Sequence, residues 1–311
     1  MNPIRLSVPT FYFIGVSTER SSIMTVFPEW SDALGLDTVI AGYDVPLKAP
    51  REAYREVVGH IKEDPLAKGA LVTSHKLDLY RASADLFDVL DPYARLCDEI
   101  SCISKREGML VGHAKDPISS RLAIDAFIPT GHFGRGGEVL CLGAGGAALA
   151  ISVTLAIQDT PGDGPRRFTL IDVDPSRLEH TRQIHQQLSQ PLEFRYLHNT
   201  DPRANDALME ALPPGSLVIN ATGLGKDRPG SPITDAGIFP YGGLAWELNY
   251  RGELDFLHQA EQQRAERALI VEDGWNYFLH GWTQVIAEVF DLQLTPGLFT
   301  QLEVVASEAR A

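Results

Sequence analysis

EVLCLGAGGAALAISVTLAIQ, residues 138–158, is the stretch that decides the fold of this chain. Its four apolar residues Val139–Leu142 predict a short buried strand, and the Ala- and Leu-rich run after the glycines predicts a helix. The letters between them fit the G-x-G-x-x-G/A turn that brings a pyrophosphate to a helix N-terminus. This strand–turn–helix context gives the pattern its weight, because glycine-rich turns are common. The residues expected to hold a dinucleotide are Gly143, Ala144, Gly145, Gly146 and Ala147.

The next predicted strand, residues 166–174, ends in a carboxylate suited to a ribose. Asp172 is expected to accept hydrogen bonds from the adenosine ribose hydroxyls and to repel a 2′-phosphate. It lies further beyond Gly143 than the usual ~20 residues, because the polar insertion DTPGDGPRR precedes the strand. Arg177 nearby is able to stack on adenine or to bind a 2′-phosphate. The sequence therefore predicts NAD as the cofactor, with NADP disfavoured.

The chain of 311 residues is long enough for two domains, since single domains commonly run about 100–200 residues. Strand-like and helix-like runs alternate along it, which favours α/β layers. We expect an N-terminal α/β substrate domain over residues 1–119, joined by a C-terminal helix from 276–311. Residues 120–275 are expected to form a Rossmann domain with a doubly wound parallel sheet. The active site would lie in the cleft between the two domains.

Three helices are expected elsewhere, from apolar residues at intervals of three and four. They cover residues 51–64, 82–96 and 272–292. The glycine-rich stretch PTGHFGRGG, residues 129–137, predicts a turn or linker ahead of the strand quoted first.

Composition and charge limit the classes of partner. Lys and Arg total 27 against 41 Asp and Glu, and the net charge of −14 disfavours nucleic acid and anionic membrane surfaces. No run approaches the ~18–20 apolar residues of a membrane helix, and the N-terminus lacks the pattern of a signal peptide. Cys97, Cys102 and Cys141 form no C-x-x-C pair and are expected to be buried thiols. A cytoplasmic protein without nucleic-acid or membrane partners is predicted.

Five segments, in their order along the chain, match the pattern of one enzyme family. Leu71–Lys76 is LVTSHK, Gly108–Asp116 is GMLVGHAKD, residues 142–148 are LGAGGAA, Asn220–Gly225 is NATGLG and Glu247–Tyr250 is ELNY. They are similar to the V-T-x-P-x-K, G-x-L-x-G-x-N-T-D, dinucleotide-loop, N-A-T-x-x-G and D-x-x-Y segments of the shikimate/quinate dehydrogenases. The chain thus resembles a divergent, shikimate dehydrogenase-like member of that family over nearly its whole length.

The resemblance implies an NAD-dependent oxidoreductase that transfers hydride between nicotinamide and a ring or small hydroxy acid. Lys76 and Asp116 would be the acid–base pair that takes or returns the hydroxyl proton. Asn220, Thr222 and Gly223 would lie near the nicotinamide. The residues implied as substrate contacts are Ser21, Thr73, Ser101, Tyr250 and Gln284. We expect a monomer or homodimer that binds a small hydroxy-acid substrate.

The departures from the family pattern gather where substrate would bind. Glu19 stands where the family has the first of two serines, and a carboxylate there would repel a substrate carboxylate. Arg20 beside it would either pair with Glu19 or grip the substrate. Ser101 replaces the family's asparagine, and Ala114-Lys115 replaces Asn-Thr ahead of the aspartate. A substrate other than shikimate itself is therefore predicted.

Two other functions stay open at this point. A different two-domain dehydrogenase, similar to methylene-tetrahydrofolate dehydrogenase, would bind folate and would not depend on Asp116. A non-catalytic, NAD-binding regulatory protein would bind NAD(H) without turnover. The histidines show no metal-ligand spacing such as H-E-x-x-H, so no metal site is predicted. Neither a P-loop nor a G-x-S-x-G elbow occurs, which disfavours NTPases and hydrolases.

Overall fold

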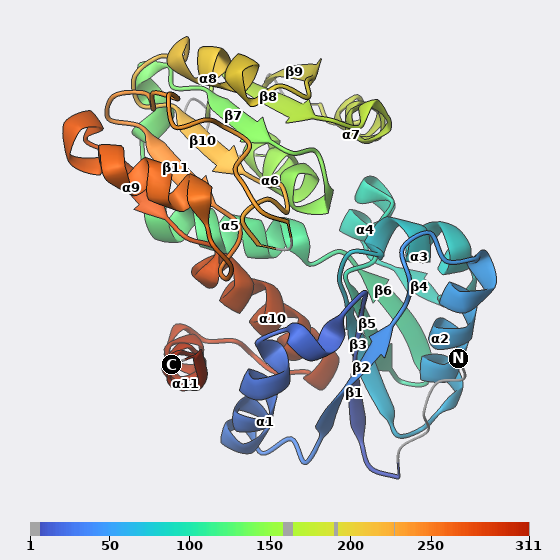
Figure 1. Ribbon diagram of the computed structural model, residues 1–311. Helices are drawn as coiled ribbons and strands as arrows, with labels where there is room; N and C mark the ends of the chain where they lie inside the picture. Colours follow the sequence, from blue (N-terminus) through green and yellow to red (C-terminus); the bar gives the residue numbers. More distant parts are fainter. Residues whose placement is uncertain (1–6, 158–163, 190–191, 227, 311) are drawn as a thin grey trace. The chain divides into compact units, whose positions relative to one another are not determined.

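The computed structural model of the chain describes residues 7–157, 164–189, 192–226 and 228–310. The chain divides into two compact units, each with its own six-stranded sheet (Figure 1). Residues 1–115 and 281–311 make the first unit, and residues 116–280 make the second.

The first unit is organised around a mixed sheet. Its strands are β1 (Thr10–Gly15), β2 (Val39–Asp44), β3 (Ala67–Val72), β4 (Val89–Leu90), β5 (Cys102–Arg106) and β6 (Met109–His113), in the order β2-β1-β3-β5-β6-β4. Strand β1 pairs parallel to β2 and β3, whereas β5 pairs antiparallel to β3 and β6. Glu107 and Gly108 join β5 to β6, and both have positive φ, which matches the twist of a two-residue hairpin.

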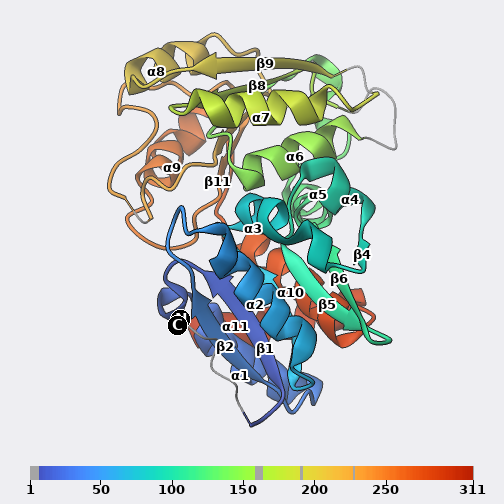
Figure 2. The same ribbon diagram turned by 90° about the vertical axis from the view of Figure 1, so that its right-hand side faces the viewer.

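Strand β1 is buried along its whole length because helices cover both faces of the sheet. Tyr12 packs into the cluster that includes α2 (Arg51–Glu63). Phe11 points the other way and stacks on Phe27 of α1 (Ile23–Leu34), with ring centroids 5.2 Å apart. Figure 2 shows α2 across the near face of this sheet. A strand buried on both faces reads as a continuous apolar run, without polar alternation.

The other helices of the first unit correct two predictions, one of which is the single C-terminal helix from 276–311, because residues 291–295 separate two helices there. These helices are α3 (Lys76–Ser83), α4 (Pro92–Cys97), α11 (Pro296–Arg310) and the C-terminal part of α10 (Trp275–Phe290). The single helix predicted over 82–96 is wrong, because a 3-10 turn and strand β4 separate α3 from α4. Asp91 ends the irregular stretch: its carboxylate accepts the Ala94 N–H at 2.6 Å, and the proline after it starts α4. A residue before proline avoids helical backbone, which explains the break.

The second unit is built on a parallel, doubly wound sheet. Its strands are β7 (Val139–Leu142), β8 (Arg167–Asp172), β9 (Glu193–His198), β10 (Leu217–Asn220), β11 (Leu244–Glu247) and β12 (Ile270–Glu272), in the order β12-β11-β10-β7-β8-β9. Every pairing between these strands is parallel. The strand order reverses between β7 and β10, and the carboxyl ends of strands at such a switch point are where these sheets bind ligands. The Rossmann sheet predicted from the sequence is confirmed.

The core of the second unit lies on both sides of its sheet. The helices are α5 (Asp116–Phe127), α6 (Gly146–Ala156), α7 (Pro175–His185), α8 (Pro202–Glu210) and α9 (Asp255–Arg267), with α5 packed on α6. Strand β7 alternates between two apolar clusters, Cys141 with Phe168 and Trp246 in one, Leu140 in the other. The three cysteines are buried free thiols, as predicted.

Candidate active site

The glycine turn after β7 has a shape that only glycine permits at its first position. Gly143 has a φ of +111°, and a Cβ there would lie 2.7 Å from the carbonyl oxygen of Ala221. Gly145 precedes α6 without a side-chain cap, and a Cβ at Gly145 would meet nothing within 4 Å. The first N–H groups of α6 therefore have space in front of them and no capping side chain. This combination suits a phosphate at the helix N-terminus.

Asp172 supports this turn from inside the fold. It is only 7% exposed, and its Oδ2 accepts the backbone N–H of Ala144 at 2.7 Å. Its Oδ1 accepts the N–H of Asp174 at 2.8 Å, so backbone donors occupy both oxygens. Asp174 is exposed at the start of α7, where the hydroxyl and N–H of Ser176 hold the pKa of its carboxyl below the ordinary value. The tip of β8 thus carries one buried carboxylate under the turn and one at the surface.

Asn220, at the end of β10, organises a second turn beside the first. It is fully buried, and its Oδ1 accepts the N–H of Thr222 at 3.1 Å and the Thr222 hydroxyl at 2.7 Å. A Cβ on Gly143 would also lie 3.2 Å from the Thr222 nitrogen, so the two turns are in contact. Gly223 follows in the same turn and is half-buried. The structure therefore brings together the residues predicted to bind the cofactor.

Tyr250 belongs to an aromatic group on the same unit. Its ring centroid lies 4.5 Å from that of Phe278 and 5.9 Å from that of Trp275. The Nζ of Lys226 lies 5.6 Å from the centre of the Tyr250 ring, within cation–π range. Two rings and one cation thus hold Tyr250 on the segment that follows β11.

Lys76 is the first residue of α3, and His75 before it is the N-cap residue, without a side-chain hydrogen bond to the first turn. His75 is fully buried, with Nε2 2.8 Å from the carbonyl oxygen of Val45 and Nδ1 3.3 Å from the Tyr54 hydroxyl. Ser74 has a φ of +56°, which turns the chain sharply between β3 and α3. His75 is therefore a packed residue that orients the segment carrying Lys76.

Lys115, the residue before Asp116, makes two contacts within the first unit. The backbone N–H of Lys115 donates to the Ser101 hydroxyl at 2.8 Å, and its Nζ donates to Glu288 Oε2 at 2.5 Å. Burial acts to raise the pKa of Glu288, but Lys115 and His113 outweigh it and hold that pKa below its ordinary value. Ser101, predicted as a substrate contact, is only 1% exposed and serves this backbone contact. Asp116 follows directly as the first residue of α5 and of the second unit.

The remaining predicted substrate contacts belong to the first unit. Ser21 follows a 3-10 turn, and its N–H donates to the carbonyl oxygen of Thr18 at 3.0 Å. A Cβ on Gly15 would lie 3.0 Å from Cγ2 of Thr73 and 3.1 Å from Cγ2 of Thr18, so both segments meet at the end of β1. Gln284 is half-buried on α10. Thr73 lies between β3 and α3, three residues before Lys76, whereas Asp116 belongs to the other unit.

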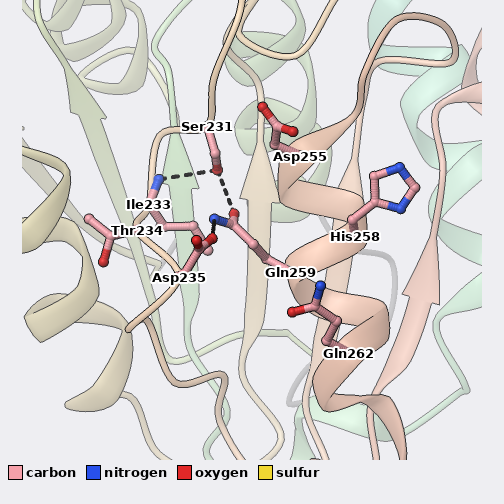
Figure 3. Close-up of a pocket in the computed structure, with 8 residues that line it drawn as sticks. All are labelled: Ser231, Ile233, Thr234, Asp235, Asp255, His258, Gln259 and Gln262. Atoms are coloured by element: carbon pink, nitrogen blue, oxygen red, sulfur yellow. Dashed lines mark hydrogen bonds between the residues drawn. The ribbon is translucent and has the colours of Figure 1, made fainter.

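A separate hollow of about 470 Å³ opens in the second unit beside α9 (Figure 3). It is lined mainly by polar side chains: Ser231, Ile233, Thr234, Asp235, Asp255, His258, Gln259 and Gln262. Gln259 spans it, accepting the Ser231 hydroxyl at 2.7 Å and donating to Asp235 at 2.8 Å. These lining residues include none of the predicted site residues.

No group of three or more His, Cys, Asp or Glu in the described part of the chain is placed to hold a metal ion. Across the same residues, no helix is long and apolar enough to cross a membrane.

Sequence reasoning missed several residues that shape the site. The sequence points to Asp172 at the end of β8, whereas Asp174 is the carboxylate at the surface; its Asp-Pro-Ser sequence is typical of a helix N-cap. In the sequence, Glu247 and Asn249 stand out only as neighbours of Tyr250. The contact of Glu247 with Asn220 joins residues 27 apart in the chain, and no local pattern reports such a contact.

Comparison with known proteins begins with sequence relatives. No family model matches the chain. The shikimate dehydrogenase (NADP(+)) of Streptococcus thermophilus is 30% identical over 184 residues, and that of Streptococcus gordonii is 29% identical over 180. These matches cover 58% and 57% of this chain and 59% and 58% of the relatives. The chain thus spans about three fifths of the length of the curated relatives it matches.

Solved structures match over nearly the whole chain at lower identity. Quinate dehydrogenase from Corynebacterium glutamicum in complex with NAD has a TM-score of 0.74 at 16% identity, covering 97% of this chain and 99% of that one. Shikimate 5-dehydrogenase from Listeria monocytogenes, in complex with shikimate and NAD, has a TM-score of 0.71 at 19% identity, covering 98% of each. 5-Ketofructose reductase from a Gluconobacter species has a TM-score of 0.70 at 20% identity, covering 97% and 100%.

Fold and site geometry define a class: a two-domain α/β protein with a Rossmann domain of the dinucleotide-binding type, which confirms the predicted fold class. Within that class the chain is similar to shikimate and quinate dehydrogenases, the resemblance that its motifs predicted. The relatives named here are dehydrogenases and a reductase.

Proposed function

We propose that the chain is a nicotinamide-dependent oxidoreductase that interconverts a secondary hydroxyl and a ketone on a small hydroxy acid or a similar polyhydroxy compound. The observation that carries this proposal is the glycine turn at the switch point of the parallel sheet. Gly143 has no room for a side chain, and Gly145 leaves the uncapped start of α6 accessible. The similarity to dehydrogenases supports the same conclusion.

The residues of the second unit fit a dinucleotide. The turn Gly143–Ala147 would receive the pyrophosphate, and Asn220, Thr222 and Gly223 would border the nicotinamide ring. The nicotinamide, when bound, would supply the two-electron exchange with substrate carbon. Asp172 would keep the turn in shape, because both of its oxygens already accept backbone N–H groups.

NAD is the preferred cofactor in this proposal. Asp172 and Asp174 place two carboxylates at the tip of β8, and a 2′-phosphate would be repelled there. The exposed Asp174 is the one suited to accept the ribose hydroxyls. Arg177 lies 4.0 Å from Asp174, which offsets part of that charge. The named sequence relatives are NADP(+) enzymes, so the preference requires a direct test.

Lys76 and Asp116 are proposed as the acid–base pair. When the hydroxyl is oxidised, its proton would pass to one member of this pair, and the same group would return it when the ketone is reduced. Lys76 is positioned by the buried His75, and Asp116 by the tethered Lys115. The proposal requires the two side chains to act on one substrate hydroxyl.

The substrate is proposed to differ from shikimate. Glu19 is exposed next to Ser21, where a substrate carboxylate would meet a like charge. Ser101 is buried against Lys115, which leaves its hydroxyl engaged within the protein. A neutral ring or keto sugar avoids the repulsion at Glu19, and the structural likeness to 5-ketofructose reductase supports including such compounds.

A turnover assay tests this proposal. The absorbance of reduced nicotinamide would be followed with NAD or NADP, using shikimate, quinate, related hydroxy acids and 5-ketofructose. We expect turnover of one compound class that Lys76→Ala and Asp116→Ala each reduce by at least about a hundredfold, while Lys68→Ala, at an exposed lysine, leaves it unchanged. Cofactor binding without turnover of any compound would favour a non-catalytic regulatory protein.

A further inference from the structure

Glu247 is a fully buried carboxylate at the end of β11, beside the turn proposed to border the nicotinamide. It is 0% exposed, and its neighbours Asn220 and Asn249 are 0% and 5% exposed. Buried carboxylates are rare unless they are paired or hydrogen-bonded, so the contacts of this group need an explanation.

Backbone and side-chain N–H donors surround the Glu247 carboxylate. Its Oε2 accepts Nδ2 of Asn220 at 2.7 Å. Its Oε1 accepts both the backbone N–H of Asn249 at 2.8 Å and Nδ2 of Asn249 at 2.7 Å. An ionised carboxylate is an acceptor at both oxygens, which matches this set of donors.

The two asparagines that Glu247 orients both hold the cofactor turn. Asn220 uses its Oδ1 for the N–H and hydroxyl of Thr222. Asn249 donates from Nδ2 to the carbonyl oxygens of Thr222 at 3.3 Å and Leu224 at 3.0 Å. One carboxylate therefore fixes the amide orientation of both residues that shape the turn.

We propose that Glu247 is a positioning residue for the cofactor turn and that loss of its negative charge weakens dinucleotide binding. The inference rests on the proposed function, since it assumes that this turn borders the cofactor. Oε1 already accepts two N–H groups, so a proton on Oε1 would displace one of the Asn249 donors. A proton on Oε2 would remove the charge that strengthens the hydrogen bond from Asn220. Protonation therefore weakens the hold of Glu247 on the amides that position Thr222.

The surroundings of Glu247 make this loss of charge accessible near neutral pH. Burial raises the pKa of Glu247 to about 7, against the opposing effect of its hydrogen bonds, and the negative charge of Asp273 adds to the rise. Asp273 follows β12, and Glu272 at the end of β12 has its pKa raised by burial and by the same Asp273. Dinucleotide affinity should therefore fall as the pH drops through this range.

Direct titration with NADH, followed by its fluorescence, tests the inference without any substrate. Measurements at about pH 6 and about pH 8.5 lie on either side of the Glu247 pKa. The wild type should bind about tenfold more tightly at the higher pH, as expected for one lost hydrogen bond to a charged group. Glu247→Gln places an amide N–H group against the N–H donors of Asn220 or Asn249. This variant should bind NADH weakly and with the same affinity at both pH values. Glu272→Gln, one strand further along, is the matched control and should behave as the wild type.

Two further measurements distinguish the loss of the Glu247 charge from misfolding of a variant. Thermal unfolding checks that each variant is folded, and Glu247→Asp keeps the charge on a shorter side chain. Glu247→Asp should bind more weakly than the wild type but retain the dependence on pH. Wild-type affinity and wild-type pH dependence in Glu247→Gln would overturn the inference alone. A wild type that binds neither NADH nor NADPH at either pH would overturn the inference together with the proposed function.

Discussion

The carboxylate of Asp172 accepts the backbone N–H of Ala144 at 2.7 Å, so one buried side chain joins the end of β8 to the glycine turn. Asp172→Asn would replace an acceptor by a donor at this contact or at the Asp174 N–H. We expect about tenfold weaker binding of both NADH and NADPH and a loss of about 1–3 kcal/mol in unfolding free energy. Fluorescence titration and urea unfolding measure the two effects. A loss confined to NADH, with stability unchanged, would return Asp172 to the ribose role.

Asp174 is expected to control the choice between the two nicotinamide cofactors. Asp174→Ala removes the exposed carboxylate that would repel a 2′-phosphate and leaves Arg177 without its partner at 4.0 Å. The ratio of NADPH to NADH affinity should rise by about tenfold or more, as one unscreened like charge would produce.

The control for Asp174→Ala is Asp201→Ala, because Asp201 caps α8 through the same contact, to the N–H two residues on. Each substitution should cost about 1 kcal/mol of stability from the lost cap. Only Asp174→Ala should change the cofactor ratio. Equal ratios in both variants and the wild type would exclude Asp174 from cofactor selection.

The raised pKa of Glu247 predicts how the unfolding free energy depends on pH. Its pKa in the folded chain is about 7, above the ordinary 4.5, so the folded state binds this proton more tightly than the unfolded state. The stabilisation from that proton is fully present below about pH 4.5 and is lost as the pH rises through 7. As the pH rises from about 4.5 to about 7, the unfolding free energy of the wild type should fall by about 3 kcal/mol relative to that of Glu247→Gln. Urea unfolding of both proteins across this pH range measures the difference. A difference that stays constant with pH would contradict the raised pKa.

Lys115 is expected to position Asp116 through its contact with Glu288. Lys115→Ala should lower kcat by about tenfold, since misplacing a reacting group costs rate. Cofactor affinity should be unchanged, and Lys115→Arg should restore much of the loss because it keeps the charge. Lys62→Ala breaks another ion pair of the first unit, that with Asp88 at 3.2 Å, and should leave kcat unaltered. Equal loss in the Arg variant would show that the charge of Lys115 is not what matters.

The parts of the fold that sequence alone could predict were those with local signals. The strand and helix around Gly143 follow from their apolar runs. The turn follows from Gly143 itself, because its backbone conformation is one that favours glycine. The helix over 51–64 appears as α2, because its apolar residues recur at helical spacing. The helix over 82–96 failed, because its apolar pattern continued across a proline that starts a new helix.

The candidate site was predictable in its motifs but not in its contacts. Asp172 ends a strand as expected, yet its burial under the turn depends on how closely β7 and β8 pair. Ser101 was matched to a substrate residue, whereas in the fold it meets the backbone of Lys115, which is 14 residues away. The contact between Glu247 and Asn220 arises because β10 and β11 are adjacent in the sheet. Such contacts depend on tertiary packing, which one sequence does not report.

The central claim, that the glycine turn holds a dinucleotide, is tested most directly by titrating Gly145→Val with NADH and NADPH beside the wild type. A Cβ at Gly145 meets nothing within 4 Å and the residue has a φ of −80°, so the variant should fold with an unchanged melting temperature. Its side chain would occupy the space in front of α6 where the pyrophosphate is proposed to lie. We predict that the wild type binds and that Gly145→Val loses affinity by about a hundredfold or more, as steric exclusion requires. Undiminished binding by a folded Gly145→Val would contradict the account.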